Sequence, residues 1–162
     1  MDSEYKALIG SWDEAIGTLL AALSSTPSIK MSSTMKTNLS LIGNVMQATG
    51  SAFVADSMKE MTLGKLGNEI QAIGNSTIVA RIILPFSQET KTNLNIKGNL
   101  LQALGSAMTL PSLLNSKNKT MDDLLNIYGA LLQVIGNSMQ AIGGMIGQNK
   151  EKGQNFNFVG SW

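Results

Sequence analysis

The sequence predicts an all-α protein of about five amphipathic helices, packed as a helical-repeat stack or bundle and followed by an extended C-terminal tail. Three observations lead to this fold class: a recurring glycine-containing unit, apolar residues at helical spacing through each unit, and breaking or capping residues between units. The 162 residues suffice for one domain with a core. We therefore expect a single repeat domain over residues 1–152 and a separate tail over residues 153–162.

The repeated unit has the form Gly-Asn-φ-φ-Gln-Ala-φ-Gly, where φ is an apolar residue. Its copies are IGSWDEAIG (9–17), IGNVMQATG (42–50), LGNEIQAIG (66–74), KGNLLQALG (97–105) and YGALLQVIG (128–136), and the half-unit NSMQAIG (137–143) follows directly. Successive copies start 33, 24, 31 and 31 residues apart, which suits one helix and a short connection per copy.

Capping and breaking residues set the expected ends of the five helices. Polar N-caps predict starts near Ser3, at Ser32 or Ser33, at Thr62, at Ser87 with Glu89, and at the capping-box-like TMDD (120–123). Prolines predict the breaks, with Pro27 in the first connection, Pro85 after the third helix and Pro111 limiting the fourth.

Glycines recur seven residues apart within the units, nearly two helical turns, so each pair lies on one side of its helix. Each helix-interior glycine costs about 1 kcal/mol relative to alanine, and close approach of another helix is the expected compensation. The alternative is that the glycines only interrupt the helices as loops. The predicted helix-contact glycines, here called the glycine stripe, are Gly10, Gly17, Gly43, Gly50, Gly67, Gly74, Gly98, Gly105, Gly129, Gly136 and Gly143.

Uncharged amides occupy the helix face where a surface helix usually carries charges. With glycine at 0°, the Gln and Asn of the unit fall at about 40° and 100°, and the apolar residues at about 200° to 300°. Buried amides cost less than buried charges, so we expect other helices or other subunits to cover part of this face; a solvated polar face is the alternative. The predicted amide stripe is Asn44, Gln47, Asn68, Gln71, Asn99, Gln102, Gln133, Asn137 and Gln140.

No pattern of catalytic or ligand-binding residues emerges. The chain has no histidine and no cysteine, which removes the commonest general base and the commonest zinc ligands. The pairs Asp13-Glu14 and Asp122-Asp123 are adjacent in sequence, and neighbours on a helix point about 100° apart. We therefore expect no enzymatic activity, no metal, no cofactor and no small-molecule substrate.

The charge pattern argues against nucleic acid as a partner, because the net charge is only +1 and the basic residues are scattered. Membrane association stays open. The stretches 37–55, 98–116 and 124–149 carry no charge and are long enough to span a bilayer, but amides and serines interrupt them.

The tail concentrates aromatic residues. Phe156, Phe158 and Trp162 are evenly spaced, so an extended peptide presents them on one side. Its last residues, VGSW (159–162), match IGSW (9–12), where the first unit begins. We predict self-association through Phe156, Phe158, Val159, Trp162 and Trp12, with the tail docking either on a neighbouring molecule or back on its own helices.

The Gly-Asn-x-x-Gln-Ala-Ile-Gly units resemble those of uncharacterised small repetitive proteins of Bacillus-type spore-forming bacteria. The resemblance covers about a third of the chain and implies no activity or cofactor, but it favours a structural role at the cell or spore surface. The N-terminus lacks signal-peptide features, so we expect synthesis in the cytoplasm without a signal peptide.

Three functions remain in view. The leading hypothesis is a structural protein that assembles with itself into a filament, sheet or oligomer, because charge is scarce and amides and glycines recur on each helix. The second is a membrane-active or membrane-surface protein, and the third is a small helical protein-binding module.

Overall fold

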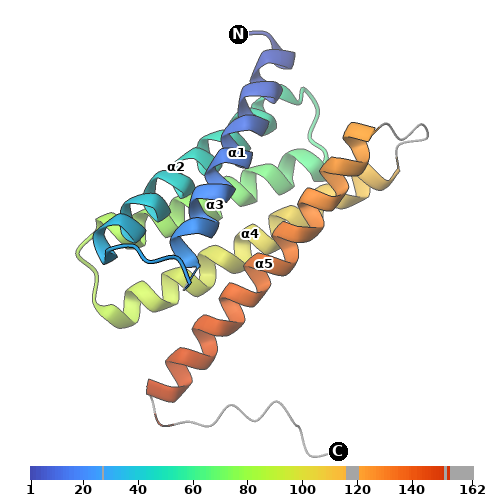
Figure 1. Cartoon of the computed structure of the whole chain (residues 1–162). Coiled ribbons are helices and arrows are strands. Elements are labelled where there is room, and N and C mark those ends of the chain that lie inside the picture. The colour runs from blue at the N-terminus through green and yellow to red at the C-terminus, as the bar shows by residue number, and fades with distance from the viewer. Residues whose placement is uncertain (27, 116–120, 152, 154–162) are drawn as a thin grey trace, which may run out of the picture.

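The protein is all-α, as predicted, and its helices pack as a bundle. The computed structural model describes residues 1–26, 28–115, 121–151 and 153, except for the side chains of residues 122, 123 and 151. Over these residues the chain forms five helices (Figure 1): α1 (Ser3–Ser25), α2 (Ser33–Ser57), α3 (Leu63–Ile83), α4 (Gln88–Leu114) and α5 (Met121–Glu151).

Three of the predicted N-caps are confirmed by side-chain hydrogen bonds. The hydroxyl oxygens of Ser32, Thr62 and Ser87 each accept from the backbone N–H three residues later, at 3.1, 3.1 and 3.2 Å. Each bond satisfies a donor that a helix start would leave unpaired. Helix α1 starts at Ser3 without such a side-chain bond, and the predicted cap at residue 120 lies outside the described residues.

The predicted limit of the fourth helix at Pro111 is wrong, because α4 continues through this residue to Leu114. A proline deprives a helix of only one N–H donor, and here the turn beyond it still forms. The backbone N–H of Asn115 bonds the carbonyl of Pro111 at 3.1 Å. By contrast, α3 ends at Ile83 before Pro85, as expected.

Each helix packs against the next one along the chain, so the five form an open array (Figure 1). The hairpin α1–α2 is followed by the hairpin α3–α4, and α5 lies along α4. Among the described residues, no Cα atom of α1 comes within 8 Å of one in α5. The first and last helices therefore face each other across a gap in the array.

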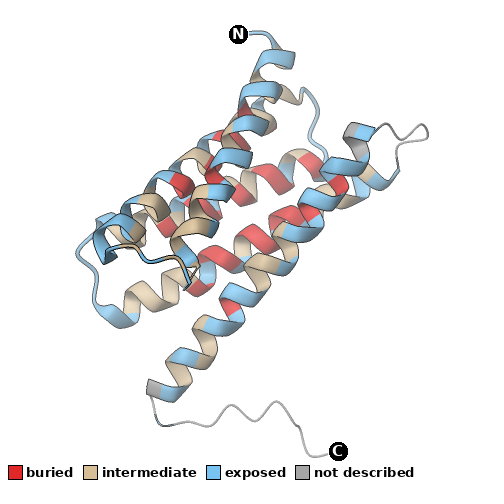
Figure 2. Ribbon diagram, in the orientation of Figure 1, coloured by how far each residue is buried: buried red, intermediate tan, exposed pale blue. Residues whose placement is uncertain are grey.

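Figure 2 shows where the buried positions lie along the helices. The residues at these positions are mostly small, with many glycines and amides among them. The apolar members of this core are few: Ala55, Ile78, Ile96, Ala103, Ile127, Ala130 and Ala141. The fully buried side chains with the largest volumes are Asn75, Ser51 and Ser106, which are all polar. Close backbone packing and hydrogen bonds therefore contribute more to this core than large apolar side chains do.

Candidate functional site: an amide-lined cleft and an apolar outer surface

Glycines meet in pairs across both hairpins. A Cβ atom built on Gly10 would lie 2.6 Å from the carbonyl oxygen of Gly50, and one on Gly17 would lie 2.6 Å from that of Gly43. The hairpin α3–α4 repeats this arrangement, with Gly67 against Gly105 at 2.6 Å and Gly74 against Gly98 at 2.8 Å. In every pair the first glycine of one unit faces the second glycine of the other. Any side chain at these positions would collide with backbone.

The residue at the fifth position of the unit, usually glutamine, also takes part in this contact between helices. The Cγ atom of Gln47 lies 2.9 Å from a Cβ built on Gly17, and the Cγ of Gln102 lies 2.9 Å from one on Gly74. Gln71 packs on Gly105 in the same way at 2.6 Å. The unit therefore encodes an antiparallel helix contact, in which each glutamine stem covers the second glycine of the partner helix.

The glycines of α5 take no part in such contacts. Cβ atoms built on Gly129, Gly136 and Gly143 would meet nothing within 4 Å. Helix α5 contacts α4 through other residues, such as Gly144, whose built Cβ lies 2.8 Å from Ile96 Cγ1. Eight of the eleven predicted stripe glycines are thus brought together in pairs, and the three of α5 face open space.

The amide stripe also differs between α5 and the other helices. Its members in α2, α3 and α4 are buried, with exposed fractions of 3% to 9%, whereas Gln133 and Asn137 of α5 are half-buried and Gln140 is exposed. The three buried asparagines of the stripe donate hydrogen bonds within their own helices. Asn44, Asn68 and Asn99 each donate from Nδ2 to the carbonyl four residues earlier, at 2.8 to 3.0 Å.

Hydroxyl groups link the amides of adjacent helices. Thr18 Oγ1 donates to Gln47 Oε1 at 3.3 Å between α1 and α2, and Ser106 Oγ donates to Gln133 Oε1 at 3.0 Å between α4 and α5. Gln148 Nε2 donates to Asn93 Oδ1 at 2.8 Å, which adds a second α4–α5 link. Neutral polar contacts thus join the helices where large apolar contacts are scarce.

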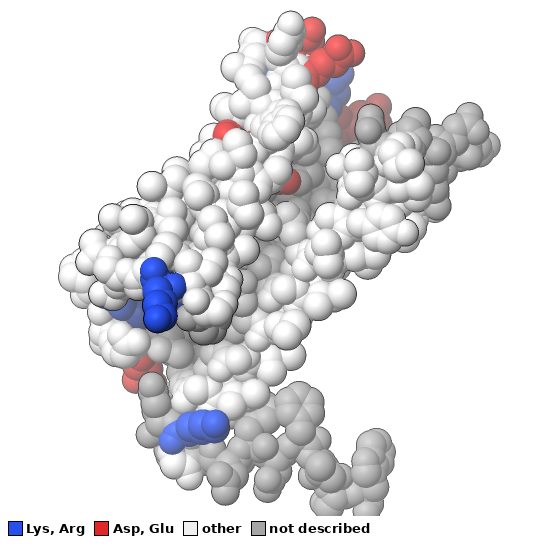
Figure 3. Space-filling model, in the orientation of Figure 1, with Lys and Arg blue, Asp and Glu red and all other residues white. Residues whose placement is uncertain are grey.

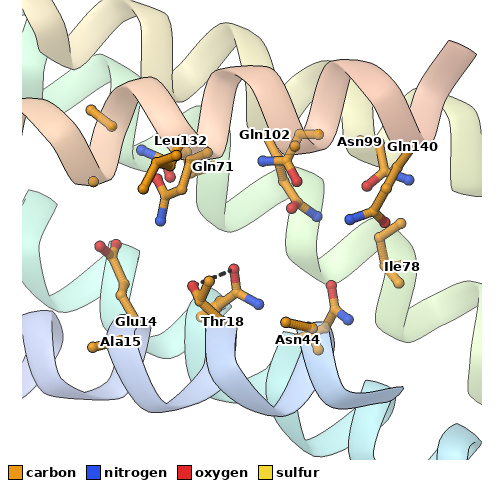
Figure 4. Close-up of a pocket in the computed structure, with 18 of the residues that line it drawn as sticks. Glu14, Ala15, Thr18, Asn44, Gln71, Ile78, Asn99, Gln102, Leu132 and Gln140 are labelled. Carbon is orange, nitrogen blue, oxygen red and sulfur yellow. Dashed lines mark hydrogen bonds between the residues drawn. The ribbon is translucent and has the colours of Figure 1, made fainter. Parts of the chain in front are cut away.

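The amides, serines and threonines line a cleft of about 1110 Å³ between the α1–α2 hairpin and α5. Figure 4 shows Glu14, Thr18 and Asn44 on one wall, and Gln71, Gln102 and Gln140 across from them. Gly129 and Gly136 also line this cleft.

Glu14 is the unusual member of the cleft. It occupies the position of the unit that holds glutamine in Gln47, Gln71, Gln102 and Gln133, and its Cγ lies 2.8 Å from a Cβ built on Gly50. Burial raises the pKa of Glu14 to about 7, although a hydrogen bond of 2.5 Å donated by Ser51 Oγ opposes this shift. In the sequence, Glu14 was singled out only as the neighbour of Asp13. The alignment of the units could have placed it among the buried amides.

Two further polar groups in the interior lack partners among the described residues. The Nε of Arg81, which lines the cleft from α3, and the Oδ1 of Asn75 are buried without a hydrogen bond. Burial also lowers the pKa of Arg81. The described residues contain no group of three or more acidic side chains able to hold a metal ion.

The apolar residues of the units face outward. At the seventh position of the unit, Ile16, Ile73, Leu104 and Ile135 are 43% to 58% exposed. We use the name outer apolar surface for the large apolar residues of the five units and their flanks that are exposed outside the cleft: Leu8, Ile9, Trp12, Ile16, Leu19, Ile42, Val45, Leu66, Ile73, Leu100, Leu104, Tyr128, Leu131, Ile135, Met139 and Ile142. On the face seen in Figure 3, the few charged groups gather mainly toward the ends of the helices.

The remaining predicted contact residues fall into two groups. Trp12 lies on α1 with 62% of its surface exposed, so it is available for a contact. Phe156, Phe158, Val159 and Trp162 lie outside the described residues. The sequence-based prediction that the tail docks therefore stays a prediction.

Among the described residues, no helix combines the length and apolarity needed to cross a membrane. Comparison with curated proteins and with solved structures gave no match. A family model does match, and it covers residues 5–162, which include every repeat unit and the tail. The chain therefore belongs to the family of unknown function DUF6944.

Proposed function

We propose that this protein is a structural protein that assembles with copies of itself, and that the outer apolar surface forms contacts between subunits. The observation that carries the proposal is the contrast between the interior and the exposed surface. Amides, serines and small residues make up most of the interior, while large apolar side chains are exposed on all five helices. Monomeric soluble proteins rarely expose apolar patches beyond a few hundred Å².

Burying apolar surface is worth about 25 cal/mol per Å², so association of such helices has a large driving force. The scarcity of charge removes the usual opposition, because a net charge of +1 provides little repulsion between copies. The glycine pairs support the same function in another way. They hold each hairpin together at close range, so the large apolar side chains are not needed for the core and remain available outside.

The C-terminal tail supplies a second contact in this proposal, docking on a neighbouring molecule through Phe156, Phe158, Val159 and Trp162. A contact between different surfaces of successive copies does not close on itself and extends an assembly into a filament. A position at the cell or spore surface follows from the resemblance of the repeat units to proteins of spore-forming bacteria.

Attachment to a membrane surface is the second candidate, because the same outer apolar surface could lie against lipid. The apolar faces of amphipathic helices insert into the boundary between headgroups and acyl chains. No described helix is suited to span a bilayer, so the candidate is a protein that lies on the membrane.

One experiment separates these candidates. The purified full chain is measured by light scattering over a range of concentrations, and in parallel by co-flotation with vesicles of neutral and anionic lipids. Self-assembly predicts particles several times heavier than the 17.2 kDa chain, with no flotation. A monomer that floats with vesicles would replace the proposal with the membrane function, and a monomer that does not float would favour a binding module.

A further inference from the structure

Helix α5 carries an incomplete version of the contact that joins the other helices. It contains two overlapping units, so three glycines follow one another at seven-residue steps. Gly129 and Gly143 are exposed, and Gly136 is half-buried. In each hairpin the equivalent glycines lie against the backbone of another helix, whereas here no described residue of another helix comes within 4 Å of a built Cβ. The described part of the chain therefore leaves this glycine face without a partner helix.

The two hairpins define the register of this contact. The first glycine of one unit faces the second glycine of its antiparallel partner, as Gly10 faces Gly50. The glutamine or glutamate at the fifth position then covers the partner's second glycine, as Gln71 covers Gly105. Both relations hold in α1–α2 and again in α3–α4. They can therefore be applied to α5 as a rule measured within the same molecule.

We propose that α5 pairs in antiparallel fashion with α5 of a second copy, about a two-fold axis at Gly136. This pairing rests on the proposed self-assembly and names the surface that starts it. In this register Gly129 lies opposite Gly143 of the second copy, and Gly136 lies opposite Gly136. The hairpin rule then places Gln133 on Gly143 of the second copy and Gln140 on its Gly136. The three stripe glycines of α5, together with Gln133 and Gln140, thus all take the places that the hairpin rule gives them in one arrangement.

The charges at the ends of α5 fit the same register. The seven-residue steps continue outward from the glycines to Asp122 near the start of the helix and Lys150 near its end. Antiparallel pairing about Gly136 sets position 122 of each copy opposite position 150 of the other. Residues 124–149 between them carry no charge. A parallel pair would instead bring like charges together, so the charges select the antiparallel arrangement.

The gap in the open array leaves the glycine-bearing face of α5 accessible. Among the described residues, no Cα atom of α1 lies within 8 Å of one in α5, and Gly129 and Gly136 line the cleft to which both helices contribute. The facing wall on α1 contributes small side chains, including Ser11, Ala15 and Thr18. A helix seated on α5 would extend the hairpin interface that the chain already uses twice.

The first test measures dimerisation of the full chain by sedimentation equilibrium, with and without Gly136→Leu. The leucine should raise the dimer dissociation constant by about a hundredfold, since it separates two backbones at the centre of the contact. It should leave helicity unchanged and raise the melting temperature of the monomer slightly, because leucine is the better helix former and no described neighbour lies within 4 Å of the built Cβ. An unchanged dissociation constant overturns the pairing.

A second pair of variants tests the register. Asp122→Lys and Lys150→Asp should each weaken dimerisation by about tenfold, since two symmetry-related attractions become repulsions. The double variant Asp122→Lys/Lys150→Asp should recover most of that loss. A double variant as weak as the singles would exclude this register.

A third variant separates this inference from the proposed function. Ile73→Gln lies on the outer apolar surface of α3, away from α5, and should reduce the size of larger assemblies without affecting the α5 dimer. If the unmodified chain assembles and only Ile73→Gln reduces the assembly, self-assembly stands and the α5 pairing is wrong. If the unmodified chain is monomeric at every concentration, both are wrong.

Discussion

At the scale of single residues, the function of a glycine depends on what lies opposite it. Gly105 is the second glycine of its unit and Gly129 is the first glycine of another, and both lie inside helices. A Cβ on Gly105 would lie 2.5 Å from the carbonyl oxygen of Gly67, whereas one on Gly129 would meet nothing within 4 Å. The seven-residue spacing predicts the stripe, but it does not distinguish a glycine under backbone contact from an open one.

This difference predicts opposite effects of one substitution. Gly105→Ala should lower the free energy of unfolding by about 1–3 kcal/mol, because overpacking against backbone exceeds the gain in helix propensity. The matched control Gly129→Ala should raise it by up to about 1 kcal/mol in the dilute monomer. Urea denaturation followed by circular dichroism measures both. Equal effects of the two substitutions would show that the glycine pairs do not hold the hairpins together.

Glu14 predicts a pH dependence of stability. An unfolded glutamate has a pKa near 4.5, whereas that of folded Glu14 is about 7, so the folded state binds the proton more tightly. The favourable contribution of Glu14 is therefore fully present below pH 4.5 and is lost as the pH rises to about 7. The total loss is about 3 kcal/mol, at about 1.4 kcal/mol per pKa unit.

Replacing Glu14 with the glutamine of the other units should remove this dependence. Glu14→Gln is expected to be more stable than the unmodified chain at pH 8, and to differ little from it at pH 4.5. Asp13→Asn changes the formal charge by the same amount and serves as the control. Thermal melts of the three proteins across pH 4.5–8 provide the comparison, and parallel curves for all three would refute the burial of the Glu14 carboxyl.

At the scale of helices, local sequence signals defined the starts better than the ends. Ser32, Thr62 and Ser87 cap helices because a hydroxyl and its nearby N–H are close in sequence and need no tertiary contact. The helix end predicted at Pro111 was wrong, because the effect of a proline depends on whether the surroundings stabilise the next helical turn. The direction in which each apolar face points could not be predicted from periodicity. Periodicity fixes which residues share a face, and only the partner helix decides whether that face is inside.

The tail is an element whose role can be separated from the fold. Removing residues 153–162 should leave helicity unchanged, because the five helices end before this segment. If the tail docks on a neighbouring molecule, the particle size should fall from that of an extended assembly toward that of a dimer. Dynamic light scattering of the full and truncated chains measures this change. An unchanged particle size would remove the tail from the assembly.

At the scale of the whole molecule, the interior consists largely of polar and small residues, and many large apolar residues lie on the surface. Glycines let the helices of each hairpin pack at close range, and the buried amides form hydrogen bonds within their own helices. Many large apolar side chains therefore stay outside the core. The sequence indicated that the amides would be covered, but it could not show that the covering helices belong to the same chain. That distinction depends on how far the units lie apart in space.

The central claim is that this outward apolar surface exists to contact other copies. Sedimentation equilibrium of the full chain tests it most directly, compared with a variant carrying Leu19→Gln, Ile73→Gln, Leu104→Gln and Met139→Gln, four positions at least half exposed. We predict that the unmodified chain forms species well above 17.2 kDa, and that the variant keeps its helicity but sediments as a dimer or monomer. Identical masses for the two proteins, or a strictly monomeric unmodified chain, would contradict the claim.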